Sequence, residues 1–594
     1  MDEIPASIIT TPISPVGQTE SVMVMLGSWC LSHPQFSLQE EIAVEVVPYH
    51  WDERERIPLD LAKIRQEYEY LLPQLADRLN AVHGTNYSLR FWRILVGWWL
   101  YWFLQVLFDR WAVLEDAAER YPTATLSRFS DQERDLASPN MAHFIQATIS
   151  DEWNERLWAD LAAEWTTLQI IREETTFDRR NSGPSNKNAV AGPTSIFPKR
   201  AAVKTWNSVA SFLNRNSDGV AIYGEYLNSH STRFKLAWKF RRLPIAVDPL
   251  ALDRLVFTNP EMRKLHLSGT DESFYSRIAS DLVGKFIPTC YLEDFADLQA
   301  RAAQLPLPLN PKIAFTVNSF SADDVWKAWA ALATERGTKL VTGQHGGGYG
   351  IKSCIATSEH EIAISDRYLT WGWSDSNNPK VIPGVAGKLI GVRKARKSGK
   401  RCLFLSTSLP PYSYLVSSEA IAGQNEKFLS NQFKLAGMLD LEIQANLTIR
   451  PGTPDFGRNL KSRWLGAHPD AIVSTDSSND WSDVRSAKVC ISVYNGTAPM
   501  EILASGKPMV WYLDPSLHEL APRFDEMAAQ MLSAKILFFD IEECALHVNS
   551  IWADVHQWWS DPSVQTVVNN FLLSYGHTGR RPIKHLARAI AQFE

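Results

Sequence analysis

The sequence is poor in cysteine and has no surplus of basic residues. Six cysteines occur in 594 residues, and none of them forms a CxxC spacing, which argues against a zinc site or a disulfide framework. The formal net charge is -6, whereas a dedicated nucleic-acid-binding protein normally carries a basic surplus. We therefore expect no nucleic-acid partner, no protein-bound metal and a reducing, cytoplasmic setting.

Several other sequence signals are also missing. The opening residues, Met1 to Pro5, lack a basic region followed by an apolar stretch, so we expect no signal peptide. No Gly-x-Gly-x-x-Gly follows the first expected strand, which disfavours a Rossmann dehydrogenase. No Asp-x-Asp pair stands at a strand end to position Mg²⁺. We expect an activity that needs neither a metal nor a cofactor.

The chain also lacks an apolar run long enough to cross a membrane. Its most apolar stretch covers residues 94–108, in a region where many of the 22 tryptophans cluster, and a bilayer span needs about 20 residues. We interpret this stretch as a buried core helix. An interfacial helix in peripheral contact with the inner membrane is the alternative.

The pattern of apolar residues indicates an α/β protein with more than one domain. The chain exceeds what one hydrophobic core usually supports. Short apolar runs at 22–26 and 44–47 precede helical periodicity, which predicts a Trp-rich helical insertion over about 55–175. Expected strands at 220–223, 313–317, 340–342 and 362–364 then alternate with helices. This alternation predicts a parallel sheet with helices on both faces.

A basic segment marks the expected domain boundary. Six of the eleven residues from 391 to 401 are Lys or Arg, and we interpret the segment as a solvated linker. Expected strands at 447–449, 471–474 and 489–493 repeat the α/β pattern beyond it. We predict two Rossmann-like domains, residues 1–390 and 402–594, that face each other across a cleft.

The most informative motif is the glycine-rich stretch that follows the expected strand at 340–342. Gln344 and His345 stand at the strand end, and Gly346 to Gly348 follow directly. Glycine allows positive φ and close backbone approach, so this turn can present N–H groups to an anion. A histidine beside it can titrate near neutral pH. The motif indicates a site for a phosphorylated or sugar-like ligand, or a tight loop with a structural histidine.

A second motif follows the expected strand at 489–493. Asn495-Gly496-Thr497 leads into a helix, with Thr497 as a candidate N-cap. The exposed N–H groups of a helix start favour phosphate. Glu501, which we place in the first turn, either accepts hydrogen bonds from ribose hydroxyls or complements the helix dipole. Arg450 ends another expected strand and suits either a diphosphate or a surface ion pair.

These motifs resemble those of the two-domain, GT-B-type glycosyltransferases. More specifically, the chain is similar to a bacterial family of transferases found with surface-polysaccharide genes. The resemblance covers most of residues 22–375 through Leu26-Gly-x-Trp29-Cys30, His50-Trp-Asp52-x-Arg54, Tyr87-Ser-x-Arg90-Phe-Trp-Arg93, Gln344-His-Gly-Gly-Gly-Tyr349-Gly350 and Asp366-Arg-Tyr-Leu-Thr-Trp371-Gly372-Trp373. The chain departs from the family pattern at Gly97-Trp98 and in the polar loop 178–193.

The resemblance implies transfer of a sugar from a nucleotide donor to a surface glycan or lipid-linked acceptor. The Gln-His-Gly element is also similar to one in capsule transferases that use CMP-linked ulosonic acids, which loosely implies such a donor. The N-terminal domain would then serve the acceptor and the C-terminal domain the nucleotide sugar. The implied donor-binding residues are Gln344, Gly346, Gly347, Arg450, Asn495, Gly496, Thr497 and Glu501.

His345 is the candidate general base, or alternatively a ligand of the leaving phosphate. Asp52, if buried beside Trp51, is the second candidate base, and an ion pair with Arg54 or Arg90 is its structural alternative. The acceptor-side candidates are His50, Trp51, Arg90 and Arg93. An epimerase or phosphotransferase on the same scaffold, or a non-catalytic glycan-binding protein, stays open as an alternative function.

Overall fold

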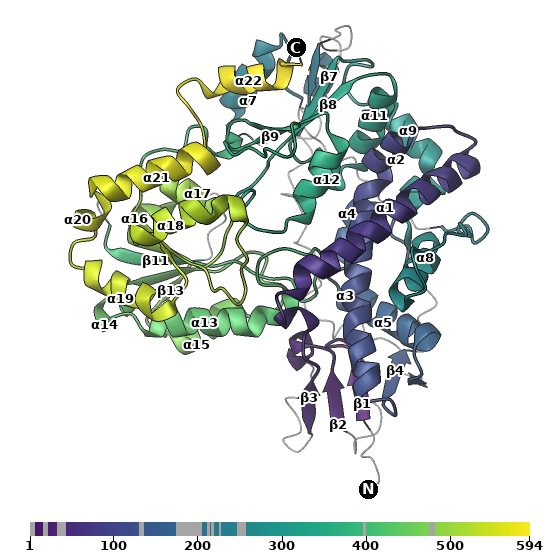
Figure 1. Cartoon of the computed structure of the whole chain (residues 1–594), viewed down its shortest axis with the longest axis horizontal. Coiled ribbons are helices and arrows are strands. Elements are labelled where there is room, and N and C mark those ends of the chain that lie inside the picture. Colours follow the sequence, from purple (N-terminus) through teal and green to yellow (C-terminus); the bar gives the residue numbers. More distant parts are fainter. Residues whose placement is uncertain are drawn as a thin grey trace.

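The structure of the chain is a computed structural model. The structure describes residues 6–15, 22–32, 43–129, 136–173, 205–210, 214, 219–224, 227, 229–245, 257–395, 399–474 and 481–593. The polar loop 178–193 lies outside these residues. The described chain is mixed α/β and builds three parallel sheets, called here sheets A, B and C in chain order (Figure 1).

Sheet A contains the first five strands in the order β3-β2-β1-β4-β5, and all its pairings are parallel. The expected strands at 22–26 and 44–47 are confirmed as its second and third members. Its strands are β1 (Ala6–Ile9), β2 (Val22–Met25), β3 (Val44–Val46), β4 (Thr125–Phe129) and β5 (Gln169–Glu173).

A long helical hairpin forms the core next to sheet A. Helix α1 (Arg56–His83) packs against a continuous helical stretch from Leu89 to Arg120, which comprises α2 (Leu89–Trp92), a π-helical turn (Arg93–Gly97) and α3 (Trp98–Arg120). This stretch is long and apolar enough to cross a membrane, but 94% of its most apolar window is buried inside the protein. The interpretation of residues 94–108 as a buried core helix is confirmed.

Sheet B lies in the middle of the chain, with the strand order β10-β9-β8-β7-β6. The expected strand at 362–364 is wrong, because these residues end helix α12 and the next strand begins at Arg367. A short apolar run cannot be told from a buried helix turn by periodicity alone. The strands are β6 (Val220–Ile222), β7 (Ile313–Thr316), β8 (Lys339–Gly343), β9 (Arg367–Thr370) and β10 (Val381–Pro383).

Helices cover both faces of sheet B. Side chains alternate along β7, so that Ile313 and Phe315 belong to one apolar cluster and Ala314 to another. Helices α11 (Asp324–Glu335) and α12 (Ala356–Ile364) contact β8 directly. Helix α5 (Asp151–Trp165) instead contacts β4 and β5 of sheet A, and α8 (Phe274–Phe286) contacts α3. The other helices of this half are α4 (Met141–Ala147), α7 (His230–Lys239), α9 (Phe295–Ala303) and α10 (Ser319–Ala322). The first 390 residues therefore contain two sheets, a partition that the strand pattern did not predict.

Sheet C has the order β13-β12-β11-β14-β15-β16, the doubly wound order of dinucleotide-binding folds. Its chain order reverses between β11 and β14, and ligands of such sheets bind beyond the strand ends at that point. The strands are β11 (Arg401–Leu405), β12 (Leu447–Arg450), β13 (Ile472–Val473), β14 (Ala487–Ser492), β15 (Met509–Tyr512) and β16 (Leu537–Phe538).

The helices of sheet C fill the left side of Figure 1. They are α13 (Asn425–Gly437), α14 (Leu441–Gln444), α15 (Leu460–Ala467), α16 (Ser482–Ser486), α17 (Thr497–Ser505), α18 (Asp525–Ser533), α19 (Ile541–Ile551), α20 (Val555–Trp559) and α21 (Pro562–Tyr575). The following helix, α22 (Pro582–Ala591), leaves this lobe and packs on β7 and α7 of sheet B. Residues 582–591 therefore belong structurally to the middle sheet.

Sheet C and its helices are joined to the N-terminal half by buried contacts. Arg54 donates to both carboxylate oxygens of Glu519, at 2.5 and 2.8 Å, and to Oε1 of Gln424 at 2.9 Å. The hydroxyl of Tyr412 donates to Asp151 at 2.6 Å, and its ring packs on Trp29. These contacts join the C-terminal half to the N-terminal half.

Candidate functional site

The glycine loop that follows β8 touches the start of helix α17 directly. The backbone N–H of Gly347 donates to Oγ1 of Thr497 at 3.0 Å. A Cβ on Gly347 would stand 2.2 Å from the carbonyl oxygen of Gly496, and one on Gly348 would stand 2.9 Å from that of Asn495. Only glycine permits this approach. The two predicted motifs, 150 residues apart, therefore meet at one place.

The side chain of Gln344 shapes the loop from inside the protein. Its Nε2 donates to the carbonyl of Gly346 at 2.8 Å, and its Oε1 accepts from Trp371 N and Trp373 Nε1, each at 2.9 Å. Gln344 is 3% exposed. The prediction that Gln344 binds the donor is thus replaced by a structural role, because its amide is already engaged with the protein.

His345 is held by a buried carboxylate. Its Nδ1 lies 3.0 Å from Oε1 of Glu361, and the hydroxyl of Tyr368 donates to the other oxygen of Glu361 at 2.8 Å. Tyr349 completes the group, with its hydroxyl 3.2 Å from the same Nδ1. Burial raises the pKa of Glu361, and the hydrogen bonds from His345, Tyr368 and Tyr349 oppose that rise.

This arrangement gives the imidazole a defined orientation. A carboxylate that accepts from Nδ1–H fixes the tautomer and stabilises the imidazolium, which makes Nε2 the nitrogen that accepts a proton. The His345 side chain is 26% exposed, whereas that of Glu361 is fully buried. The pair has the form of a general base supported by an orienting acid.

The start of α17 differs in detail from the prediction. Gly496 is the N-cap, and no side chain caps the helix there. Thr497 is the first helical residue, so the N-cap prediction for it is wrong. Glu501 is also not in the first turn, which contains no acidic residue. The first N–H groups of α17 are thus left without a side-chain cap.

Asn495 is the most informative residue at this helix start. It is 1% exposed, and neither Oδ1 nor Nδ2 has a hydrogen-bond partner among the residues that the structure describes. Leaving a buried amide unpaired costs about 1–3 kcal/mol. Ser408, just beyond β11, likewise has a buried hydroxyl without a partner within the described chain. Both residues follow the two strands at the switch point of sheet C.

Glu501 lies among cationic side chains. Burial raises its pKa, and Lys388 and Arg450 oppose that rise. Arg450 also donates to both carboxylate oxygens of Asp483. Arg450 is therefore part of a largely buried ion pair rather than the surface pair considered from the sequence, and it retains electrostatic reach to Glu501.

The structure does not support Asp52 as a buried base. Asp52 is exposed and accepts from Nε2 of Gln424 at 3.1 Å. Its alternative, an ion pair with Arg54 or Arg90, is also not observed, because these arginines pair with Glu519 and Asp366. Adjacency to Trp51 did not predict burial, since a 3₁₀ turn places neighbouring side chains on different sides.

The acceptor-side candidates have structural roles. Trp51 is fully buried and donates to Asp60, and His50 is buried beside Asp109. Burial lowers the pKa of His50, an effect that Asp109 opposes. An acceptor cannot reach a fully buried ring, so the prediction is wrong for Trp51.

The two arginines on the predicted acceptor side are occupied by ion pairs. Arg90 bonds to Asp366 and thereby fixes α2 to the start of β9, and Arg93 forms a bidentate pair with Glu69. The motif at residues 87–93 therefore contacts the motif at residues 366–373 through Arg90 and Asp366.

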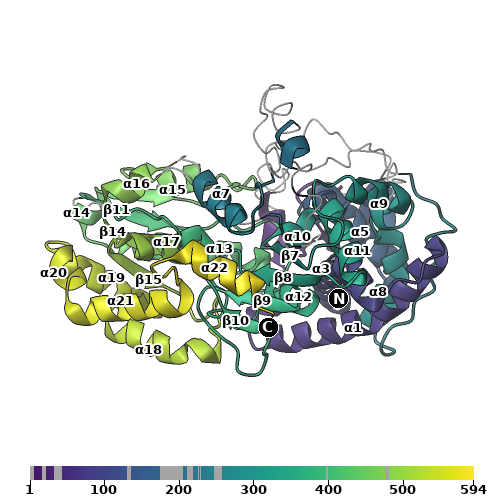
Figure 2. The same ribbon diagram turned by 90° about the horizontal axis from the view of Figure 1, so that it is seen from above.

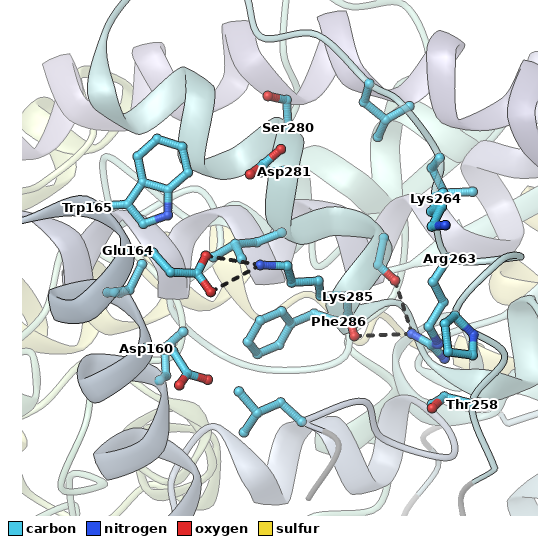
Figure 3. Close-up of a pocket in the computed structure, with 18 of the residues that line it drawn as sticks. Asp160, Glu164, Trp165, Thr258, Arg263, Lys264, Ser280, Asp281, Lys285 and Phe286 are labelled. Carbon is cyan, nitrogen blue, oxygen red and sulfur yellow. Dashed lines mark hydrogen bonds and ion pairs between the residues drawn. The ribbon is translucent and has the colours of Figure 1, made fainter. Parts of the chain in front are cut away.

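A cavity of about 690 Å³ lies elsewhere, between α5, α8 and residues 258–267 (Figure 3). Leucines and Phe286 form much of its wall. Its charged side chains pair within the protein, as Lys285 does with Glu164 at 3.0 Å and Arg263 with Glu293 at 2.7 Å. The cavity shares no lining residue with the glycine loop or α17, and we place no function there.

Sequence reasoning missed Glu361, Lys388 and Ser408. Glu361 directly precedes the run 362–364, for which the sequence predicted a strand instead of the end of α12. Its spacing of 16 residues from His345 gives no signal in the sequence. Lys388 lies in a short 3₁₀ turn (Gly387–Leu389) that contacts α17. No cluster of three or more potential metal ligands occurs in the described part of the chain.

The chain can be compared with known proteins by sequence and by structure. No curated protein matches the chain. Among solved structures the chain is similar to Acinetobacter baumannii MurG, with 11% identity over 50% of this chain and 77% of that one. It is also similar to WaaG, a glycosyltransferase involved in lipopolysaccharide biosynthesis, with 11% identity over 63% and 100%. Both TM-scores are 0.28, too low to support conclusions about fold or activity. A family model, in contrast, matches residues 6–590, and the chain belongs to the LIC12162 family of transferases.

Proposed function

We propose that this transferase is a GT-B-type glycosyltransferase that moves a sugar from a nucleotide donor to a hydroxyl acceptor. The observation that carries the proposal is the His345–Glu361 pair, placed on a loop that touches the start of α17. The candidate base and the start of α17, which favours phosphate, therefore lie on two segments that contact each other. Sugar transfer from an activated phosphate needs these two functions.

The donor would bind beyond the carboxyl ends of β11 and β14. The uncapped N–H groups of α17 and its dipole favour the diphosphate or monophosphate of the donor. The buried amide of Asn495 supplies a donor and an acceptor that the described protein leaves unused. Glu501 would accept hydrogen bonds from ribose hydroxyls, and Arg450 would offset the negative charge of the leaving phosphate.

The chemical step follows from this placement. The acceptor hydroxyl oxygen attacks the anomeric carbon while His345 Nε2 takes its proton. The bond between the anomeric carbon and the phosphate oxygen breaks, and the nucleotide leaves with the electron pair. Glu361 stabilises the imidazolium that results.

The acceptor would be a surface glycan or a lipid-linked sugar, and the donor would be a CMP-linked ulosonic acid, as the family resemblance implies. The sugar and the nucleotide of the donor can be identified by experiment. A thermal-shift screen with CMP, UDP, GDP and CDP conjugates identifies the nucleotide, because a bound ligand stabilises only the folded form.

The decisive experiment compares wild type with His345→Ala on the nucleotide sugar found in that screen. We expect release of nucleotide and a glycosylated acceptor with wild type, no transfer by the variant, and nucleotide affinity that is nearly unchanged. Unchanged turnover by the variant would remove His345 from the mechanism. An epimer or a phosphorylated product in place of the glycoside would point to the epimerase or phosphotransferase alternative.

A further inference from the structure

Two adjacent helices that cover one face of sheet B form an unusual surface. Helices α7 and α22 contact each other and lie side by side in both views (Figures 1 and 2). Leu236 on α7 and Leu586 and Ile590 on α22 are buried in the apolar cluster under sheet B. The remaining sides of the two helices face solvent. We call this surface the α7/α22 face.

The α7/α22 face is strongly basic in an otherwise acidic chain. Residues 230–242 contain five Lys or Arg, residues 576–593 contain four, and neither segment contains Asp or Glu. The whole chain has 60 basic and 66 acidic residues. The exposed cations are Lys235, Lys239, Arg241, Arg580, Arg581, Lys584 and Arg588. A surface patch with the average composition of this protein would carry both basic and acidic side chains.

Exposed aromatic side chains stand among these cations. Trp238 is 66% exposed and Phe234 is 43% exposed, and their rings stack with centroids 6.0 Å apart. Trp206, 40% exposed, donates to the carbonyl of Pro244 just beyond α7. Trp206 and Trp238 are the exposed tryptophans among the described residues, whereas many of the others lie in the core.

We propose that the α7/α22 face binds an anionic lipid surface. Tryptophan and phenylalanine enter the boundary between headgroups and acyl chains, while Lys and Arg bind the lipid phosphates. A soluble polyanion without an apolar or aromatic part, such as heparin, would explain the cations but not the outward Phe234–Trp238 pair. The proposal concerns binding alone and does not depend on glycosyl transfer.

The α7/α22 face adjoins the candidate site. Lys388 lies in the 3₁₀ turn that contacts α17. Burial lowers the pKa of Lys388, Glu501 of α17 opposes this shift and Arg233 of α7 adds to it. A small pocket is lined by Gln344 after β8, Gly387 of the same turn and Leu586 of α22, so α22 also approaches the glycine loop. Membrane binding through this face would hold a lipid-linked acceptor next to the candidate site.

The test measures co-sedimentation of the full chain with vesicles of phosphatidylglycerol and phosphatidylcholine or of phosphatidylcholine alone. We expect binding to the anionic vesicles that weakens as salt increases. The double variant Lys235→Glu, Lys239→Glu should bind at least about 25-fold more weakly, since each cation contributes about fivefold. Trp238→Ala should weaken binding by about tenfold.

The matched control reverses two lysines of the opposite lobe, Lys434→Glu and Lys461→Glu, which are exposed on α13 and α15. It should bind vesicles as wild type does. Circular dichroism and melting temperature establish that all variants fold. The proposal is overturned if wild type does not bind anionic vesicles, if both double variants bind equally, or if the face binds heparin but not vesicles. The last result would indicate a soluble polyanion as the partner.

Discussion

At the scale of single residues, the orientation of His345 depends on a carboxylate that has no contact with solvent. Glu361 accepts from His345 and Tyr368, so both of its oxygens are engaged in positioning. Replacing Glu361 by Gln removes the negative charge but keeps the shape of the side chain. The effect of the charge can then be separated from the effect on the orientation of His345. The tautomer of His345 is the property that such a change affects first.

Glu361→Gln should lower kcat by about 10²-fold or more while nucleotide affinity stays close to that of wild type, because the amide can no longer stabilise an imidazolium. The measurement is steady-state turnover together with calorimetry of nucleotide binding. Glu359→Gln is the matched control, since Glu359 lies on the same helix but pairs with Arg65 at the surface. Equal losses in both variants would contradict a specific role for Glu361.

His360, the neighbour of Glu361, predicts acid sensitivity of the fold. It is 3% exposed, its ring packs on Trp98 with centroids 5.1 Å apart, and neither nitrogen has a partner among the described residues. Burial lowers its pKa well below the ordinary value, and Lys327 and Arg93 add to the shift. The folded state therefore holds the ring neutral.

Below about pH 6.5 the unfolded chain binds a proton that folded His360 does not, so the free energy of unfolding should fall by up to about 1.4 kcal/mol per pH unit from this group. This stability is fully present above the unfolded pKa and is lost as pH decreases. His360→Leu should show a smaller difference between pH 7.5 and 5.5 in urea unfolding. The same pH dependence in the variant would exclude His360 as the cause.

Sequence reasoning succeeded at residues whose role depends on backbone position and failed where burial decides. The glycine turn at Gly346 to Gly348 and a helix start close to Thr497 are visible in the sequence, and the structure brings them together. The N-cap itself is Gly496 and not the predicted Thr497. Trp51 and Asp52 are adjacent in sequence, yet one is fully buried and the other exposed. Burial of this kind follows from long-range packing, which a local pattern does not contain.

At the scale of elements, the glycine loop and α17 act as a single unit. The loop leaves sheet B, and the helix belongs to sheet C, so their contact couples the two sheets. Its geometry tolerates no side chain at Gly347. The element-level prediction concerns that position.

Gly347→Ala should destabilise the fold by about 1–3 kcal/mol and weaken nucleotide binding, because its Cβ would meet the Gly496 backbone. Gly466→Ala is the matched control, since Gly466 lies within α15 and a Cβ there meets no atom within 4 Å. This control should be neutral or stabilising by about 1 kcal/mol. Thermal unfolding of both variants, with and without nucleotide, checks the prediction; a fully stable Gly347→Ala protein would contradict it.

The element pattern was predictable for most of sheet C and only partly for sheet B. Expected strands at 447–449, 471–474 and 489–493 match β12, β13 and β14. The apolar run at 362–364 was assigned to a strand, and β9 was missed three residues later. Which strands pair with which depends on contacts between distant residues, so the division of the first half into sheets A and B was not predictable from periodicity.

At the scale of the whole molecule, Arg54 connects the two halves. Its guanidinium is 8% exposed and bonds to Glu519, Gln424 and two carbonyl oxygens of the C-terminal half. Truncating one partner of a largely buried pair leaves the other charge unsatisfied, which costs about 3–5 kcal/mol. A contact between halves also determines whether they unfold together.

Arg54→Met should lower stability by about 3 kcal/mol or more and split calorimetric unfolding into two transitions. Arg65→Met is the matched control, because Arg65 pairs with Glu359 across an exposed surface and should cost no more than about 1 kcal/mol. A single transition for Arg54→Met at the wild-type temperature would show that the halves are held together by other contacts.

The position of α22 has a consequence for the order of folding during synthesis. Its Leu586 and Ile590 cover an apolar surface formed by Ile313, Phe315 and Val341, yet residues 582–591 leave the ribosome long after those strands. Until then, Leu236 of α7 covers this face only in part, and the area under α22 stays open to water. Chaperone binding to this intermediate should therefore end only after α22 has packed on the sheet.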